Sequence, residues 1–382
     1  MMRQRRVAVV GMGSTAFRSV TPDLSYRELT HEAAVKAYHD AGVEPKQIDG
    51  FVSCAEDFLE GYSIADEYIP DQLGAVLKPV QTVPGDAIQG MGTALMMIMT
   101  GQFDIVAVQA MSKASNMLTL NEMVNFAMDP IMNRMFPEIY HFVAALEMNR
   151  YLHETGVTKE QCAKVVVKNR MNALKNPGAG HGAELSVQTV LDSPVVSSPL
   201  NQLDISEHSD GAVVMVLAAE DVLPSLSGDP VWIEGIGWSS EAVSLESRDW
   251  SGSVSTGLAA KMAFKQAEIK PSDVDVAEIN DEYSFKELVH MESLGLCVPG
   301  EAVSLLEAGE TEVDGIMPIN PSGGALGVGH LFECSGAHKV AEICTQLRGQ
   351  AGTRQVKDPH VGIAQSWRGV PTTTSAVVIL AN

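Results

Sequence analysis

The chain is short of positive charge. Against 48 Asp and Glu residues it carries only 26 Lys and Arg, which gives a formal net charge of −22 at pH 7. A protein that binds nucleic acid needs a basic face to neutralise phosphates, so this balance argues against a nucleic-acid partner. An anionic small ligand remains compatible with it, because a local basic patch can lie on an acidic protein.

Cysteine is also scarce, and the cysteines are scattered. They form no Cys-x-x-Cys pair, so the sequence predicts neither a zinc site nor a disulfide framework. We expect buried free thiols and no metal in this chain. The five cysteines are Cys54, Cys162, Cys297, Cys334 and Cys344.

Long apolar runs are missing as well. The Met-rich run Met91–Met99 is too short to span a membrane, and it contains Gly92. At the N-terminus, basic residues precede the apolar run Val7–Val10, which stops at Gly11 and is too short for the core of a signal peptide. We therefore predict a buried first strand, no membrane span and a cytoplasmic protein.

What the sequence does contain is an internal repeat. Residues 33–49 have apolar side chains at helical spacing, and this pattern turns at Pro45 before a short apolar run. The segment that begins at Ala259 follows the same order, and Pro271 takes the place of Pro45. The repeat predicts that two copies of one unit are joined in a single chain.

Each predicted half opens and closes with a short run of the kind that forms a buried strand. β-branched runs bounded by Gly or polar residues suit central strands, and the helical segments between them suit a mixed α/β sheet. The fold class is therefore α/β with a duplication. The runs are Val7–Gly11 and Asp210–Ala218 in residues 1–225, and Val231–Gly235 and Thr374–Ala381 in residues 226–382.

The first half contains an extra stretch at about residues 111–200. It is rich in Met and holds two helical patterns, Ile139–Tyr151 and Lys159–Leu174. We interpret it as an insertion that lies over the entrance to a site. A subdomain that only packs against the core is the alternative, because Met serves adaptable binding surfaces and cores equally well.

Two passages of the second half resemble the signatures of the thiolase superfamily. Residues 255–283 end in Asn280–Tyr283, which is similar to the family's Asn-Glu-Ala-Phe motif, and residues 320–330 are similar to its Asn-Pro-x-Gly-Gly…Gly-His loop. The family carries the same duplication, and among its branches the motifs most resemble those of the sterol-carrier-protein-type thiolases. The resemblance implies a layered αβαβα fold with two mixed five-stranded sheets and an inserted loop domain.

The resemblance also implies an enzyme that makes or breaks a C–C bond of an acyl-CoA thioester. In thiolases one cysteine takes the acyl group, a second exchanges a proton with Cα, and Asn and His donors hold oxyanions. Asn280 and His330 match these donors. The loop glycines Gly323 and Gly324 would let the backbone come close to the ligand.

Basic residues of the insertion are candidates for contacts with coenzyme A. Lys164, Lys168 and Arg170 lie on one predicted helix, although such a stripe is more often a solvated face. The two donors also have structural alternatives. Asn280 could cap its own turn, and His330 could be a satisfied histidine of the core.

Neither cysteine of the family's chemistry is present. Where the nucleophile belongs, before the helix near Gly92, the sequence has Ala87 and Ile88. The proton-exchanging cysteine of the sterol-carrier branch is matched by Glu282, and the Cys-x-Gly loop of other thiolases by residues 365–369, which contain no cysteine. An acyl-enzyme is therefore excluded at these positions, whereas C–C chemistry by acid and base is not.

Retro-aldol cleavage of a β-hydroxyacyl-CoA needs only a base and oxyanion donors. Glu282, Tyr283 and Asp86 are the candidate acids and bases, because a carboxylate in an apolar cleft has a raised pKa. Asp86 could instead be a helix N-cap, and Tyr283 could simply pack where the family has Phe. Glu333 is unusual at its position and could shape the pocket.

Three functions stay open on the sequence. The first is a thiolase-type acyl-CoA enzyme with altered chemistry, the second a retro-aldolase, and the third a non-catalytic subunit that binds coenzyme A or lipid. Asn280 and His330 favour the first two, because a scaffold needs neither. The resemblance further implies a homodimer joined through the N-terminal sheets, and a small zinc-ribbon/OB-fold partner subunit.

Overall fold

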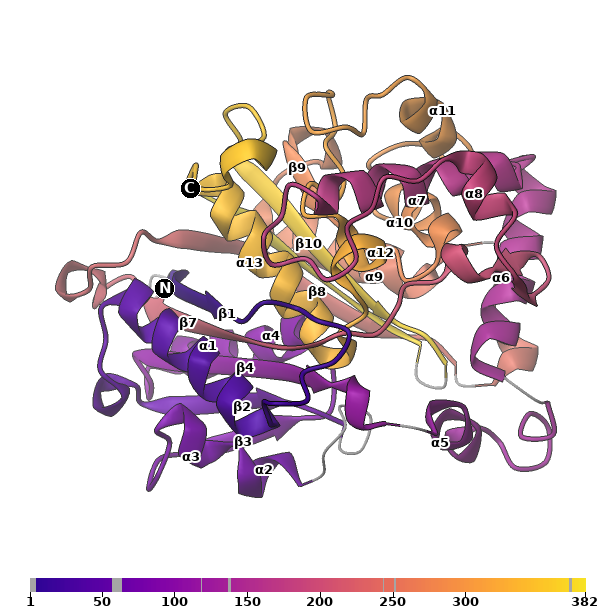
Figure 1. The fold of residues 1–382 in the computed structure, drawn as a ribbon. Helices are drawn as coiled ribbons and strands as arrows, with labels where there is room; N and C mark the ends of the chain where they lie inside the picture. Colours follow the sequence, from indigo (N-terminus) through magenta and orange to yellow (C-terminus); the bar gives the residue numbers. More distant parts are fainter. Residues whose placement is uncertain are drawn as a thin grey trace.

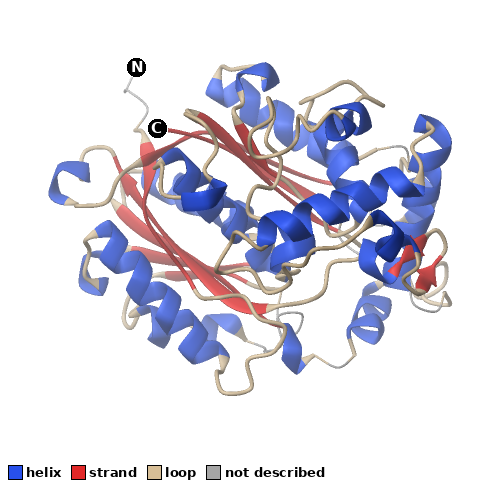
Figure 2. Cartoon of the chain, turned by 45° about the horizontal axis from the view of Figure 1, so that its top comes forward, coloured by secondary structure: helices blue, strands red, loops and turns tan. Residues whose placement is uncertain are grey.

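The chain folds into two blocks of strands with helices between and around them (Figure 1). The computed structural model describes residues 5–56, 64–117, 119–136, 139–242, 244–250, 252–370 and 373–382. Figure 2 shows how the strands run through the molecule while helices and loops surround them. This arrangement agrees with the α/β class predicted from the strand-like and helical patterns.

The first half builds five strands in the order β3-β2-β4-β7-β1. Strands β4 and β7 are buried along their whole length, which agrees with their continuous apolar sequence. β2 pairs in parallel with β3 and with β4, whereas β7 is antiparallel to β4 and β1, so the sheet is mixed. The strands are β1 (Val7–Ser14), β2 (Gly50–Cys54), β3 (Val80–Val83), β4 (Ile105–Lys113) and β7 (Asp210–Ala219).

Among its described residues the second half builds four strands, β8-β11-β10-β9, and these continue the first sheet. The junction is short, since β1 pairs with β8 only through Ala8 with Trp232 and Val9 with Val231. The expected second five-stranded sheet is therefore one strand smaller, and Ile319 makes only an isolated bridge to Ala277 beyond the edge. The strands are β8 (Val231–Ser240), β9 (Val276–Glu278), β10 (Val361–Arg368) and β11 (Thr374–Ala381); β5 (Val195–Ser197) and β6 (Leu200–Asn201) pair separately.

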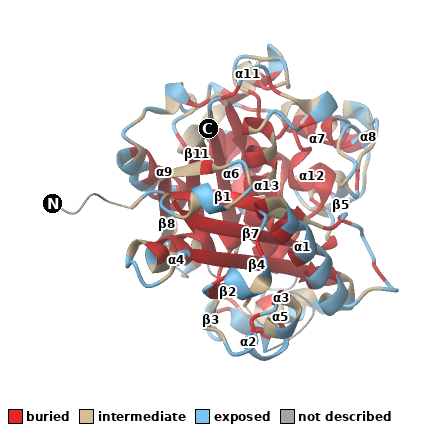
Figure 3. Cartoon of the chain, turned by 90° about the vertical axis from the view of Figure 1, so that its left-hand side faces the viewer, coloured by how far each residue is buried: buried red, intermediate tan, exposed pale blue. Residues whose placement is uncertain are grey.

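Alternate residues of the strands face different helical layers, as the two-residue period of a strand requires. In β7, Met215 belongs to a central core with the helices α4 (Ala87–Met99) and α13 (Ser335–Leu347), whereas Val214 packs in an outer core with α1 (Tyr26–Ala41). The same alternation in β11 faces α13 on one side and α9 (Val254–Ala267) on the other. Five layers, αβαβα, result, and Figure 3 shows the buried strands β4 and β7 with α1 beside them.

The internal repeat is visible as structure. Helix α1 is followed by the turn Pro45–Gln47 and strand β2, and α9 is followed by the turn Pro271–Asp273 and strand β9. Because each copy places an apolar helix face on its own sheet, the helix pattern and the proline turn recur together.

Both helical patterns of the insertion form helices. Cys162, Val165 and Val166 of α7 are buried in the core of the second half, while α6 carries residues to the cavity described below. Figure 1 shows α5 lying apart from the sheets. The insertion helices are α5 (Leu120–Ala127), α6 (Ile139–Thr155), α7 (Lys159–Ala173) and α8 (Val187–Leu191); the other helices are α2 (Ala65–Tyr68), α3 (Pro70–Leu73), α10 (Ser284–Ser293), α11 (Ala302–Glu307) and α12 (Gly324–Val328). In the described part of the chain, every helix is too short or too polar to cross a membrane.

Candidate active site

A small cavity lies where the insertion meets the loops after β9, α12 and β10. Its volume is about 40 Å³, which is enough for a few atoms of a ligand rather than for a whole acyl chain. Carboxylates, an arginine and a histidine lie in its wall beside apolar side chains. It is lined by Glu56, Leu120, Val124, Tyr140, Glu282, His330, Phe332, Glu333, Trp367, Arg368, Gly369 and Val370.

Glu282 is held in this wall by a residue from the insertion. It lies in the loop between β9 and α10, and the hydroxyl of Tyr140 on α6 donates a short hydrogen bond to its Oε1. Its second oxygen, Oε2, is buried and has no hydrogen-bond partner among the described residues. Burial raises the pKa of Glu282 above its ordinary value, although the hydrogen bond from Tyr140 opposes this shift. Such a carboxylate is suited to act as a base near neutral pH.

His330 also lies in the wall of the cavity, directly after α12 and Gly329. Gly329 has a φ of 121°, which a residue with a side chain adopts only with strain. The His330 ring contacts Phe332 and His208 at centroid distances of 4.7 and 5.4 Å, and its Nδ1 has no partner among the described residues. Burial lowers the pKa of His330 to about 4, so the ring is neutral at pH 7 and keeps one N–H to donate.

A partly buried ion-pair cluster completes the polar wall. Arg368, the last residue of β10, pairs through Nη2 with Glu56 and through Nε with Glu333 at 3.1 Å. Burial alone would lower the pKa of Arg368, but the two carboxylates outweigh it and raise the value. Glu56 follows β2, so this cluster joins the two halves of the chain at the cavity.

Asn280, expected as an oxyanion donor, does not line the cavity. Its Nδ2 donates to the carbonyl of Trp367 at 3.2 Å, and its Oδ1 accepts from the backbone N–H of Glu282 at 3.1 Å. The structural alternative is therefore the one observed, because the short amide side chain closes its own turn and fixes the loop that carries Glu282.

Tyr283 and Asp86 also lie outside this cavity. The Tyr283 hydroxyl is 3.3 Å from Nδ1 of His141, and Tyr283 lines a smaller neighbouring cavity together with Tyr140 and Trp367. Asp86 is the N-cap of α4: its side chain accepts from the backbone N–H groups of Ile88 and Gly336, each at 2.8 Å. Burial raises the pKa of Asp86 to about 6.

The loop glycines approach protein rather than the cavity. A side chain at Gly323 would meet Cβ of Ala173 at 2.6 Å, and one at Gly324 would meet the Asp281 carboxylate at 2.2 Å. Gly324 also has a φ of 58°. These positions require glycine because α12 packs closely against α7 and Asp281, so the expected backbone contact with a ligand is not what the structure shows.

Lys168 and Arg170 do not fit the expected contacts with coenzyme A, because both side chains are buried. Lys168 pairs with Glu287 at 2.9 Å, and Arg170 donates to the carbonyl of His181 at 2.8 Å. The alternative of a solvated face holds only for Lys164, whose pair with Glu307 is exposed, whereas the side chains of Lys168 and Arg170 point into the protein.

A larger groove of about 540 Å³ lies instead on the outer side of α6. It holds two arginines, a histidine and an indole ring, which suit phosphate and aromatic groups. Arg248 also lines the smaller cavity that contains Tyr140, so the groove and the cavities adjoin. The groove is lined by Leu146, Asn149, Arg150, His153, Arg248, Asp249 and Trp250.

The described residues of the cavity wall include no thiol. Cys54 packs against α4, where its Sγ lies 2.1 Å from the place that a Cβ on Gly90 would take. It is fully buried, and burial raises its pKa well above the ordinary value. Cys334 is also fully buried, and its thiol donates to the Ala110 carbonyl at 3.3 Å. Neither is an activated nucleophile. The part of the chain that the structure describes also contains no group of three or more potential metal ligands.

Sequence reasoning placed Glu282, His330 and Glu333 near the site and missed Tyr140, Arg368 and Glu56. Tyr140 begins a helix of the insertion, and nothing in its local pattern indicates a contact with a residue 142 positions away. Arg368 belongs to residues 365–369, which were compared with the Cys-x-Gly loop. The position of that loop indicated a site residue here, but the comparison looked only for a cysteine.

Fold and site together define a duplicated α/β protein whose cavity offers carboxylate and imidazole groups for acid–base chemistry. The sequence matches the thiolase N-terminal domain over residues 7–221 and the thiolase C-terminal domain-like family over residues 237–382. The chain therefore belongs to the thiolase superfamily, and its relatives place it in the sterol-carrier-protein-type branch.

Three relatives and one solved structure show which proteins this chain is similar to. It is 32% identical to an acetyl-CoA acetyltransferase of Methanothermobacter thermautotrophicus, over 97% of this chain and 98% of that protein. It is 30% identical to sterol carrier protein 2 of Gallus gallus (92% and 68%) and 28% identical to a 17-hydroxy-3-oxo-4-pregnene-20-carboxyl-CoA lyase of Mycobacterium tuberculosis (97% and 98%). The solved structure of an Ltp2-ChsH2(DUF35) aldolase superposes with a TM-score of 0.84 at 25% identity, over 98% and 97% of the chains.

Proposed function

We propose that this protein cleaves the Cα–Cβ bond of a β-hydroxyacyl-CoA thioester by a retro-aldol reaction, or forms that bond in reverse. The observation that carries the proposal is the Glu282 carboxylate, which has one oxygen fixed by Tyr140 and one without a partner, in a cavity whose described wall includes no thiol. A relative named as a lyase and a similar structure named as an aldolase support this choice over thiolysis.

In the proposed reaction Glu282 is the base. Its Oε2 takes the proton of the β-hydroxyl, the C–O bond of the substrate becomes a carbonyl, and the Cα–Cβ bond breaks. The electron pair moves into the thioester as an enolate. The proton that Glu282 has taken then passes to Cα, which gives an acyl-CoA beside an aldehyde or ketone and restores the carboxylate. Because burial raises the pKa of Glu282, the carboxylate is a better proton acceptor than an exposed glutamate.

His330 is the proposed donor to the enolate oxygen. Its ring is neutral at pH 7 because burial lowers its pKa to about 4. A neutral N–H donor stabilises a developing enolate without first transferring a proton to it. Asn280 contributes indirectly, since it fixes the backbone of Glu282 and leaves the oxyanion to His330.

Coenzyme A would lie in the groove on α6. Arg150 and His153 are exposed there, and the Arg248 guanidinium lies 5.4 Å from the Trp250 ring. Phosphates would contact the cationic side chains, and the thioester arm would pass Arg248 toward the cavity. This groove replaces Lys168 and Arg170 as the site at which we expect the cofactor portion of the substrate.

A homodimer and a small zinc-ribbon/OB-fold partner remain part of the proposal. Strand β3 is the edge of the nine-stranded sheet, and an unpaired edge is a ready template for a second copy. Phe126, Ile131 and Met135, on and after α5, are 76%, 79% and 83% exposed, which supports a protein partner at the insertion. The name of the similar aldolase structure, Ltp2-ChsH2(DUF35), contains two components, which also favours a second subunit.

The test is an assay of the purified protein, alone and with the product of any adjacent small gene, on a β-hydroxyacyl-CoA. Release of an aldehyde or ketone together with a shorter acyl-CoA, without consumption of free coenzyme A, supports the proposal. Cleavage of a β-ketoacyl-CoA that depends on free coenzyme A would show thiolysis instead. Binding of acyl-CoA without turnover of either substrate would favour the non-catalytic alternative.

A further inference from the structure

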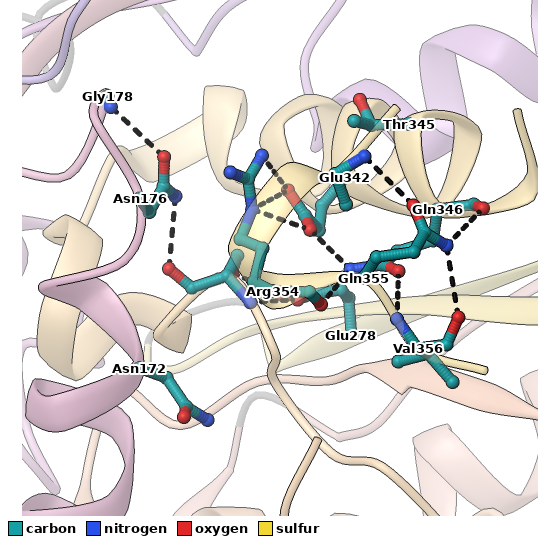
Figure 4. A network of polar contacts seen from close by, with 12 residues as sticks. Asn172, Asn176, Gly178, Glu278, Glu342, Thr345, Gln346, Arg354, Gln355 and Val356 are labelled. Carbon is teal, nitrogen blue, oxygen red and sulfur yellow. Dashed lines mark hydrogen bonds and ion pairs between the residues drawn. The ribbon is translucent and has the colours of Figure 1, made fainter. Parts of the chain in front are cut away.

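Two Arg–Glu pairs of this chain, each with a buried carboxylate, differ in one respect. Glu342 on α13 is bonded at both oxygens: Arg354 donates to Oε1 and Oε2 at 2.9–3.0 Å, and Gln346 donates to Oε1 at 2.9 Å (Figure 4). Glu333 is equally buried, and Nε of Arg368 lies 3.1 Å from its Oε1. Its Oε2 has no partner among the described residues.

An unpartnered buried carboxylate oxygen is costly, because the oxygen has lost its water and gained no donor. At Glu342, which lies outside the cavity, both oxygens of a buried glutamate have hydrogen-bond donors from the protein itself. Glu333 lines the cavity, whereas Glu342 does not. The free oxygen of Glu333 is therefore best explained by a donor that arrives with the ligand.

Glu333 cannot turn away easily to find another partner. Arg368 fixes its first oxygen, and Arg368 is in turn held by Glu56 on the other half of the chain. The carboxylate is thus pre-positioned in the wall, and a ligand group that meets it gains a charge-assisted hydrogen bond without reordering the site.

The same cavity contains a second such oxygen, Oε2 of Glu282. In the proposed reaction that atom receives the β-hydroxyl of the substrate. We infer that Glu333 is a specificity-determining residue that accepts a hydrogen bond from a second hydroxyl on the acyl group, so that the preferred substrates are dihydroxyacyl-CoA thioesters. This inference rests on the proposed function for the role of Glu282.

A hydroxyl fits this position better than an ammonium group. Glu333 already has a cationic partner in Arg368, which it shares with Glu56, and a hydroxyl is far cheaper to remove from water than a full positive charge. The small volume of the cavity, about 40 Å³, also suits a hydroxymethyl group beside the reacting carbons.

The experiment compares 3-hydroxybutyryl-CoA with 3,4-dihydroxybutyryl-CoA, which differ only in the second hydroxyl. For the unmodified protein we expect kcat/KM to be roughly 10-fold or more higher for the dihydroxy substrate. In Glu333→Met that preference should disappear, mainly through loss of activity on the dihydroxy substrate. In the matched control Glu342→Gln, which alters an Arg-paired glutamate outside the cavity, the preference should persist.

Equal kcat/KM values of the unmodified protein for the two substrates would overturn the inference and leave the proposed function intact. This measurement decides the matter even where Glu333→Met does not fold. If neither thioester is cleaved, the proposed function fails, and calorimetric titration with the same two thioesters decides the inference separately. A tighter Kd for the dihydroxy compound supports the role of Glu333, and equal Kd values overturn it.

Discussion

The Tyr140 hydroxyl donates a hydrogen bond to Glu282 across 142 positions of sequence. The donor belongs to the insertion and the acceptor to the second half of the duplicated fold. The contact therefore makes the insertion part of the wall of the candidate site. It leaves one carboxylate oxygen of Glu282 for chemistry, and the behaviour of variants at both residues depends on it.

Replacing Glu282 with Gln should lower kcat/KM for the β-hydroxyacyl-CoA by roughly 10²–10⁴-fold, because the base is lost while the shape remains. The same change should stabilise the fold. A pKa raised by burial means that stability is lost as the pH rises from the unfolded value toward the folded value, so the gain in thermal stability should be larger at pH 8 than at pH 4. An inactive variant whose gain in stability over the unmodified protein is no larger at pH 8 than at pH 4 contradicts this account.

Replacing Tyr140 with Phe should move the acidic limb of the kcat/KM profile to higher pH. The hydrogen bond from Tyr140 favours the ionised form of Glu282, so its loss raises the pKa of Glu282 further. The matched control is Tyr151→Phe on the same helix, whose hydroxyl bonds Glu292 at 3.0 Å outside the cavity. An unshifted profile for Tyr140→Phe, or an equal shift for Tyr151→Phe, would count against the role of Tyr140.

Buried neutral histidines should make the fold sensitive to acid. Burial lowers the pKa of His330 to about 4 and that of His338 to about 3, so their contribution is full above the unfolded value of about 6.5 and is lost as the pH falls toward the folded values. His338→Gln should therefore lose less stability than the unmodified protein between pH 6.5 and pH 4, as measured by denaturant unfolding. His360→Gln, an exposed control, should follow the unmodified protein; if both variants do so, burial of His338 is not a source of acid sensitivity.

Replacing Arg150 with Ala should raise KM for the acyl-CoA about 5- to 10-fold with little change in kcat, because a phosphate contact holds substrate and transition state equally. Arg150 is exposed and pairs only with its neighbour Glu154 among the described residues, so the fold should be unaffected. The control is Glu154→Gln, which frees Arg150 without removing it. An unchanged KM in Arg150→Ala would exclude a phosphate contact at this side chain.

Lys168 is expected to act on stability alone. Lys168→Met leaves the buried carboxylate of Glu287 without its counter-charge, and this should lower the free energy of unfolding by about 3–5 kcal/mol. The control Lys164→Met breaks the exposed pair with Glu307 and should change stability little. A raised KM for the acyl-CoA in folded Lys168→Met would instead indicate that Lys168 contacts the ligand.

The helices and central strands could be predicted because each rests on a local pattern. The apolar spacing before Pro45 and before Pro271 produces α1 and α9, and the continuous apolar run of β7 produces a strand buried on both faces. The strand count of the second sheet could not be predicted in the same way. Ile319 lies beside Ala277 through a single bridge, and whether such a segment counts as a strand depends on its neighbours rather than on its sequence.

The sequence by itself determined the duplicated α/β fold, the absence of a cysteine at the start of α4, and the presence of Glu282 and His330 in their loops. Only the tertiary structure decided what these loops face. In the folded chain Asn280 and Asp86 cap backbone N–H groups, and Lys168 forms a buried ion pair. Tyr140, Arg368 and Glu56 meet at the cavity. The physical reason is that a period of 2 or 3.6 residues specifies an element and its buried face, whereas the partner of a polar side chain depends on the packing of elements far apart in the chain.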